Sequence, residues 1–247
     1  MISIVIANKL LNIMKKHFYF LFSVLFTALA HANIQVFPMV TTISGKTREE
    51  RVERLSVKSL SDKVQLISVV TKKIINPATN KQKEVDYSYN DKDCALVTIP
   101  QTLVLPPGST RNIKLIATCT PYQEQIYRTR VSGIPNDVNV DNKNTDSANI
   151  SVSLSWGTLV HLLPENSMVK FMIKDGNLFN YGNVSAKVST VSLCASELDC
   201  EDVKIEKSLF PNGNFISLSE HVNLKTKAIR IQYEAYNISN NEVELIL

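Results

Sequence analysis

Apolar and polar residues alternate with a period of two along much of this chain, most clearly in residues 148–164. Side chains two positions apart lie on the same face of a β-strand. The pattern therefore predicts a strand with serines on one face and four large apolar side chains on the other, namely Ile150, Val152, Leu154 and Trp156. A polar loop, residues 136–147, precedes this strand, and Pro164 follows it.

Short alternating segments separated by Pro, Gly, Asn and Ser continue through the rest of the chain after residue 33. No window longer than about ten residues keeps the 3.6-residue period of an amphipathic helix. This spacing is typical of an all-β sandwich. We expect seven strands between residues 33 and 163 and a second set between 165 and 247. Two sets of this size fit two domains that meet near Pro164.

The first 32 residues have the features of a secretory signal peptide. Lys15 and Lys16 precede an apolar run, residues 18–30, which is followed by Ala30-His31-Ala32, a small-x-small cleavage pattern. The run is shorter than the roughly 20 residues that a membrane-spanning helix needs. We expect cleavage after Ala32, a mature chain that begins at Asn33, no membrane insertion and, as an alternative start of translation, Met14.

Removal of the leader changes the charge of the protein. The full chain has a formal net charge of +4, from 27 basic and 23 acidic residues. The leader carries three lysines, Lys9, Lys15 and Lys16, and no acidic residue, so 24 basic residues face 23 acidic ones, a net charge of +1. No block of basic residues is left, and nucleic acid is therefore excluded as an expected partner.

All four cysteines lie after the leader, which favours disulfides formed in an oxidising compartment. Cys94 and Cys119 are equally far from the Pro106-Pro107-Gly108 turn, so a hairpin about that turn places them opposite each other. Cys194 and Cys200 flank a short acidic loop and would close a second hairpin. A zinc site is the alternative, but neither pair has CxxC spacing and only two histidines, His161 and His221, remain.

Residues for catalysis are hard to find in this sequence. It contains no Gly-x-Ser-x-Gly, no His-Glu-x-x-His and no phosphate-binding glycine loop, and the whole chain has seven glycines. The acidic residues are scattered along loops, as on a solvated surface. We therefore expect no enzyme activity, no catalytic residue, no metal and no cofactor.

Several short segments, in order along nearly the whole mature chain, resemble one family. They are residues 33–38 (Asn-Ile-Gln-Val-Phe-Pro), 71–77 (Thr-Lys-Lys-Ile-Ile-Asn-Pro), 97–101 (Val-Thr-Ile-Pro-Gln), 105–109 (Leu-Pro-Pro-Gly-Ser), 113–115 (Ile-Lys-Leu), 126–128 (Ile-Tyr-Arg) and 181–184 (Tyr-Gly-Asn-Val). The chain resembles the periplasmic chaperones of chaperone–usher fimbriae, and more closely the alternate branch that serves colonization-factor-type fimbriae.

The resemblance implies two immunoglobulin-like domains in a boomerang arrangement, residues 33–163 and 164–247. It also implies a periplasmic chaperone that binds major and minor fimbrial subunits and delivers them to an outer-membrane usher. Through donor-strand complementation, the strand at 148–163 would complete an unfinished subunit, as its alternating pattern allows. The other interpretation of the pattern is that these side chains fill the core of the protein's own sandwich.

Better-known members of the family bind the carboxylate at the end of the subunit with two basic residues, one on the first strand and one on the donor strand. This sequence has Thr41 and Thr42 in the first region and Leu159 in the second. An arginine can bind a carboxylate through two parallel hydrogen bonds. The candidates for the anchor are therefore Arg128, then Arg130, with His161 nearby.

Two other functions fit a secreted β-sandwich protein. A surface adhesin or other binding module would be a stable monomer or homo-oligomer outside the cell with no captured subunit. A β-sandwich enzyme would need a catalytic site, which the sequence does not show. A free chaperone could also cover its own donor strand by forming a homodimer.

Overall fold

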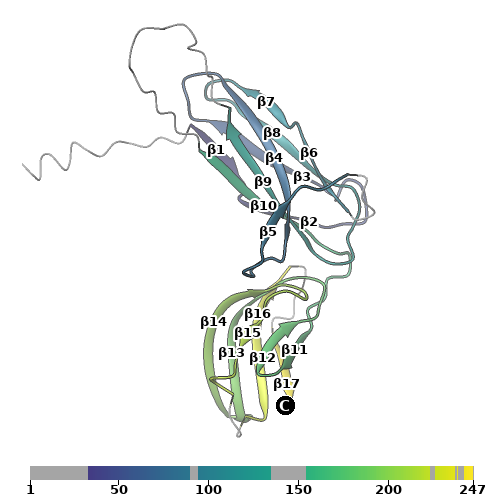
Figure 1. Cartoon of the computed structure of the whole chain (residues 1–247), viewed down its shortest axis with the longest axis vertical. Coiled ribbons are helices and arrows are strands. Elements are labelled where there is room, and N and C mark those ends of the chain that lie inside the picture. Colours follow the sequence, from purple (N-terminus) through teal and green to yellow (C-terminus); the bar gives the residue numbers. More distant parts are fainter. Residues whose placement is uncertain are drawn as a thin grey trace, which may run out of the picture. The chain divides into compact units, whose positions relative to one another are not determined.

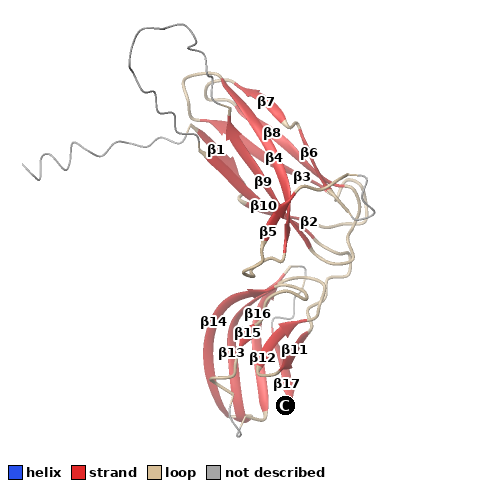
Figure 2. Ribbon diagram, viewed as in Figure 1, coloured by secondary structure: helices blue, strands red, loops and turns tan. Residues whose placement is uncertain are grey.

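A computed structural model describes residues 33–89, 94–134, 154–222, 226–236, 238 and 242–246. The chain divides into two units, Met1–Asn33 and Ile34–Leu247, and the account below concerns the second. Its described residues form strands, turns and loops (Figure 1), with no helix in the colouring by secondary structure (Figure 2). Within these ranges no helix has the length and hydropathy needed to cross a membrane.

Two sheets form the first sandwich. One has the strand order β1 (Ile34–Phe37), β3 (Val52–Ser59), β8 (Thr110–Ala117), β6 (Leu96–Ile99). The other has the order β2 (Val40–Ile43), β10 (Ser155–Leu162), β9 (Gln125–Gly133), β4 (Gln65–Ile75), β5 (Lys83–Val85), and β7 (Thr102–Leu105) also pairs with β4. The β2–β10 pair is parallel, whereas the other pairs of these sheets are antiparallel.

The first sandwich has ten strands where the sequence predicted seven. The first extended segment changes sheets after Phe37: β1 pairs with β3, and β2, only two residues later, pairs with β10. The sequence indicated β1 but not β2, because two of the four β2 residues are threonines and no alternation marks it. A pairing between residues more than 100 positions apart decides that this segment is a strand.

Alternate residues of these strands fill the first core. In β3, for example, Leu55 and Val57 are fully buried, while Glu53 and Lys58 are exposed. Burial of one such aliphatic side chain contributes roughly 1.5–3 kcal/mol. The buried members of this core are Ile34, Val36, Ile43, Leu55, Val57, Ile67, Val69, Leu96, Leu105, Ile113, Leu115, Ala117, Tyr127, Val131, Val160 and Leu162.

A second sandwich follows, with a core that shares no member with the first. Its sheets have the orders β11 (Phe171–Lys174), β12 (Asn177–Asn180), β15 (Ile216–Ser217) and β14 (Asp199–Leu209), β13 (Ala186–Ser196), β16 (Ala228–Ala235), β17 (Glu242–Ile246). The prediction of an all-β protein with two sandwiches is confirmed. The boundary at Pro164 falls between β10 and β11 and stays a prediction.

The sequence did not indicate β12, because its first and last residues are asparagines, which are uncommon in strands. The structure explains one of them. Asn180 is buried, and its side-chain amide donates to the carbonyl oxygens of Val184 (2.8 Å) and Leu209 (3.1 Å). The side chain thus satisfies main-chain acceptors that would otherwise be buried without a partner.

Both predicted disulfides are present, Cys94–Cys119 and Cys194–Cys200. The β6–β8 register continues the symmetry about the proline turn, with Leu96 opposite Ala117, so Cys94 lies opposite Cys119 just beyond the paired residues. Between these strands, β7 leaves the hairpin and pairs with β4 in the other sheet. Cys194 and Cys200 are directly opposite in the β13–β14 hairpin.

Gly182 is the glycine of the Tyr-Gly-Asn-Val segment, and no other residue fits there. A Cβ atom at this position would lie 2.1 Å from the carbonyl oxygen of Met168 and 2.8 Å from the Cα of Val169. We expect Gly182→Ala to lower the free energy of unfolding by about 2–3 kcal/mol, because main-chain atoms must move. Thermal denaturation measures this loss. Gly133→Ala, where a Cβ meets nothing within 4 Å, is the control, and equal midpoints for the two variants would contradict the prediction.

Candidate functional site

The edge of strand β10 is open over half of its length. Along one edge, β10 pairs with β9 from Ser155 to Leu162. Along the other edge, β2 pairs only with the second half, beginning at Leu159, whose N–H donates to the carbonyl oxygen of Met39 (2.9 Å). In the described part of the chain, no strand pairs with the β2-side edge of residues 155–158. An open edge of this kind can accept a further strand.

The interior face of β10 carries apolar residues beyond the end of the protein's own core. Val160 and Leu162 are buried core members, and Trp156 packs partly buried against the same core. Leu154 continues this period-two row, yet 53% of it is exposed. The protein's own core therefore covers the row only as far as Trp156.

Two polar atoms on the same face lack a partner. The indole Nε1 of Trp156 and the hydroxyl of Thr158 are both buried without a hydrogen bond in the described structure. A buried polar group without a partner costs about 1–3 kcal/mol. This part of β10 is thus incompletely satisfied in the isolated chain.

The structure describes two of the four predicted donor residues. Leu154 and Trp156 lie on one face, as the alternation requires. Ile150 and Val152, together with the rest of the predicted strand before residue 154, lie outside the described residues. Their use as donor residues stays a prediction.

The opposite, outer face of the β4–β9–β10 sheet carries a group of charges, which we call the outer cation cluster. It consists of Lys72, Arg128 and Arg130 with the carboxylates of Glu84 and Asp86. The register sets Lys72, Arg128 and Leu159 side by side on β4, β9 and β10, and likewise Val70, Arg130 and Gly157. Three cations against two carboxylates leave a net charge of +1.

Glu84 connects the two arginines of the cluster. Its carboxylate lies 2.7 Å from a terminal nitrogen of Arg130 and 3.3 Å from Nε of Arg128. Arg128 is the less satisfied of the two, because its Nε is buried and this contact does not have the geometry of a hydrogen bond. Its side chain passes over Gly157, where a Cβ would lie 3.3 Å from Arg128 Cδ. The sequence gave no indication of Glu84, which lies on the three-residue strand β5.

His161, the third candidate for the anchor, lies in a buried network. Its Nδ1 is 2.5 Å from Glu124 Oε1, and 7% of the residue is exposed. Glu124 also accepts hydrogen bonds from the N–H (2.5 Å) and the hydroxyl (3.1 Å) of Ser185. The charge of Glu124, together with burial as the larger cause, raises the pKa of Tyr236, whose ring lies 5.4 Å from that of His161.

Glu124 corrects the expectation that the acidic residues lie on a solvated surface. It follows β8 in a short loop and is 9% exposed, with its side chain almost entirely covered. Sequence reasoning missed it, because its partners are 37 and 61 positions away and a lone Glu in a loop resembles a surface residue. An internal carboxylate thus occupies the side of His161 that an external one would need.

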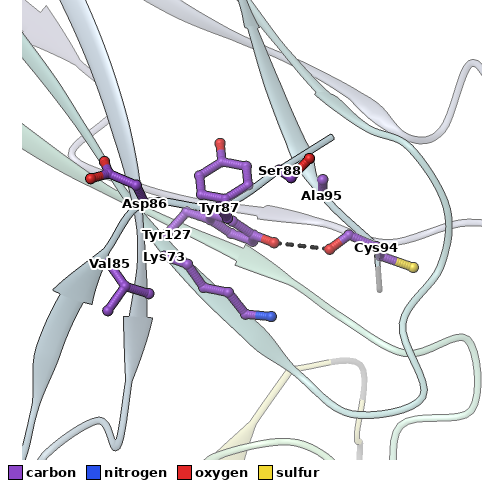
Figure 3. Close-up of a pocket in the computed structure, with 8 residues that line it drawn as sticks. All are labelled: Lys73, Val85, Asp86, Tyr87, Ser88, Cys94, Ala95 and Tyr127. Carbon is purple, nitrogen blue, oxygen red and sulfur yellow. Dashed lines mark hydrogen bonds between the residues drawn. The ribbon is translucent and has the colours of Figure 1, made fainter. Parts of the chain in front are cut away.

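A small cavity of about 190 Å³ lies beside the first disulfide (Figure 3). Its lining includes Tyr87, which follows β5, and Tyr127, which lies on β9. Tyr87 donates to the carbonyl oxygen of Leu96 (2.5 Å), and Tyr127 donates to that of Cys94 (3.0 Å). Burial raises the pKa of the Tyr87 hydroxyl. Both hydroxyls hold the segment that leads into β6, and we assign them a structural role.

Comparison with known proteins gives full-length matches. No family model matches the sequence. The fimbrial protein of Escherichia coli described as the A subunit of CFA/I is 29% identical over 243 residues, which cover 94% of this chain and 99% of that protein. The corresponding B subunit of CS1 fimbriae, also from Escherichia coli, is 27% identical over 213 residues, 82% of this chain and 86% of that protein.

Solved structures share the two-domain fold. The class 5 fimbriae chaperone CfaA superposes with a TM-score of 0.71 at 24% identity, over 87% of this chain and 98% of that one. A chain from a chaperone–tip adhesin complex of CFA/I fimbriae gives a TM-score of 0.72 with the same identity and coverage. The strand topology, the two disulfides and the full-length sequence match agree, and the chain belongs to the chaperone family of the chaperone–usher fimbriae, in its class 5 branch.

Proposed function

We propose that this protein is a periplasmic chaperone that binds fimbrial subunits by donor-strand complementation and delivers them to an outer-membrane usher. The observation that carries the proposal is the apolar row of β10, which continues to an exposed Leu154 beyond the protein's own core. The open edge of β10 beside this row supplies the main-chain groups for pairing.

Both partners gain from such an arrangement. A subunit that lacks a strand exposes two unpaired strand edges and an apolar groove, which promotes aggregation. A strand inserted there satisfies the edges with main-chain hydrogen bonds and fills the groove with alternate side chains. The driving force for release at the usher would be the better packing of the next subunit's strand, so the mechanism requires no nucleotide.

The site of action follows from the family and the leader. Fimbrial chaperones are periplasmic proteins, and residues 1–32 carry the charge and hydropathy pattern of a cleaved signal. The proposal therefore includes export and cleavage after Ala32. The mass of the intact mature protein tests this step, since an N-terminus other than Asn33 would contradict it.

The direct test of the chaperone function is recovery of the partner. The tagged protein is purified from its own host at native expression, and the intact masses in the sample are measured. A stoichiometric small secreted subunit in the sample supports the chaperone. Recovery of the chain alone, mainly from the cell surface, would instead favour the adhesin.

We further propose that Arg128, assisted by Arg130, binds the carboxylate of the captured subunit. Arg128 has a buried Nε without a hydrogen bond, and the outer cation cluster has one positive charge in excess. We expect Arg128→Ala to lower the yield of the chaperone–subunit complex about tenfold, a loss of about 1.4 kcal/mol, without unfolding the chaperone. Quantification of copurified subunit measures the effect.

A matched control for this variant is Arg230→Ala, which removes an arginine that pairs with Glu244 in the second sandwich. Its complex yield should equal that of the unmodified protein. A wild-type yield for Arg128→Ala would exclude Arg128 as the anchor.

A further inference from the structure

The second sandwich carries five large apolar side chains on the outer face of its three-stranded sheet. We call them the Met–aromatic patch: Met168, Met172, Phe179, Tyr181 and Phe215. Four of them are 41–53% exposed, and Phe179 is partly buried between its neighbours. The ring of Phe179 lies 5.6 Å from that of Phe215 and 6.2 Å from that of Tyr181.

The register makes the patch continuous. Met172 lies opposite Phe179, and β12 continues this row to Phe215 at the start of β15 (Figure 1). Tyr181 donates its N–H to the carbonyl oxygen of Lys170, and Asn183 does the same to Met168, which extends the β11–β12 ladder by two further steps. At about 3.3 Å per residue, the patch from Met168 to Lys174 is roughly 20 Å long.

The fold does not need these side chains. The inner face of the same sheet supplies the core with Phe171, Leu178 and Ile216. The outer residues could be polar without loss of that core, yet they are large and apolar. Contiguous exposed apolar patches on soluble proteins mark interaction sites, and Met and aromatic residues are enriched in interfaces.

Lysines surround the patch. Lys170 and Lys174 are exposed on β11 or directly before it, at either side of Met172, and Lys207 donates to the carbonyl oxygen of Phe215 (2.9 Å). None of the three forms an ion pair in the described structure. Asp175, in the β11–β12 turn, is the only acidic residue between 168 and 181.

We propose that the Met–aromatic patch binds an acidic, apolar segment of a partner protein. Apolar side chains of the partner would cover Met172, Phe179 and Phe215, and its carboxylates would pair with the surrounding lysines. A patch of this length accommodates about six extended residues or a helix of about 13 residues. The segment is distinct from the subunit groove that receives β10, so this surface adds a second binding site to the chaperone.

The charges argue against a second copy of the same chain. A symmetric dimer through this face would bring two sets of three lysines together, because both copies present the same surface. Like charges opposed across an interface are unfavourable. An acidic partner segment removes that cost and gains the ion pairs.

The test uses the mature full-length chain and two labelled peptides of about nine residues. In one, Asp and Glu flank a Leu-x-Phe centre; in the other, lysines replace the acidic residues. Fluorescence anisotropy should show binding of the acidic peptide at least tenfold tighter than that of the basic peptide. Phe179→Thr and Lys174→Glu should each weaken it about tenfold, and Val104→Thr, at an exposed position on β7 in the first sandwich, should not.

Three results would overturn the proposal. The first is equal binding of the two peptides, or binding that both patch variants leave unchanged. The second is dimerisation of the unmodified chain, seen by sedimentation, that Phe179→Thr abolishes. The third is patch-dependent binding to phosphatidylglycerol vesicles that exceeds binding to the peptide.

Folding is checked by circular dichroism. If Phe179→Thr fails to fold, Lys170→Glu combined with Lys174→Glu gives the same test from exposed positions. Capture of fimbrial subunits is measured in parallel. Normal capture by a patch variant with lost peptide binding separates this surface from the donor strand.

Discussion

Replacement of Val152 and Leu154 by Asp is expected to abolish subunit capture while the chaperone still folds. In the complex these side chains would enter the apolar groove of the subunit, where a charged carboxylate without a partner is strongly unfavourable. A cost of about 3 kcal/mol or more lowers affinity by over a hundredfold. The amount of subunit that copurifies from the periplasm measures the effect.

Folding should survive the change at Leu154, because this residue is already 53% exposed and lies beyond the protein's own core. Substitutions at such positions usually change the free energy of unfolding by less than about 0.5 kcal/mol. Trp156, the only tryptophan of the chain, reports by its fluorescence whether the first sandwich is intact.

Ser155→Asp is the matched control for this prediction. It introduces the same charge one residue away, on the opposite face of β10, where the side chain is exposed. Capture by this variant should be close to normal. If the Val152→Asp, Leu154→Asp double variant and the unmodified protein capture equal amounts of subunit, this segment is not the donor strand.

Replacement of Glu124 by Ala is expected to lower the free energy of unfolding by about 3 kcal/mol. The carboxylate is the hydrogen-bond acceptor for His161 and for both the N–H and the hydroxyl of Ser185. Its removal leaves these buried groups without their partner and opens a small cavity. In a domain pair of this size, the thermal midpoint should fall by roughly 6–12 °C.

Two further variants define the cause of this loss. Glu124→Gln keeps the shape and one acceptor, so its effect should be smaller than that of Glu124→Ala. Glu165→Ala removes a carboxylate from an exposed pair with Lys46, and such pairs contribute about 0–1 kcal/mol. A loss for Glu124→Ala no larger than that for Glu165→Ala would show that the buried network does not stabilise the fold.

Much of the fold was evident from the sequence, because period-two alternation depends on local backbone geometry. The core strands β3, β4 and β8 were recognised in this way, and so was the apolar row that ends in Leu154 and Trp156. The disulfides followed from the symmetry of two hairpins. The polar strands β2 and β12 were missed, since their pairing partners rather than their own residues make them strands.

The candidate site divides in the same manner. The sequence by itself determined which side chains share a face of β10, because alternation along one strand requires no knowledge of its neighbours. Only the tertiary structure decided where the protein's own core ends along that face, which edge of β10 is open, and that Glu84 and Glu124 contact Arg128 and His161. These properties depend on residues from strands and loops distant in sequence, and their contacts form only when the sheets are assembled.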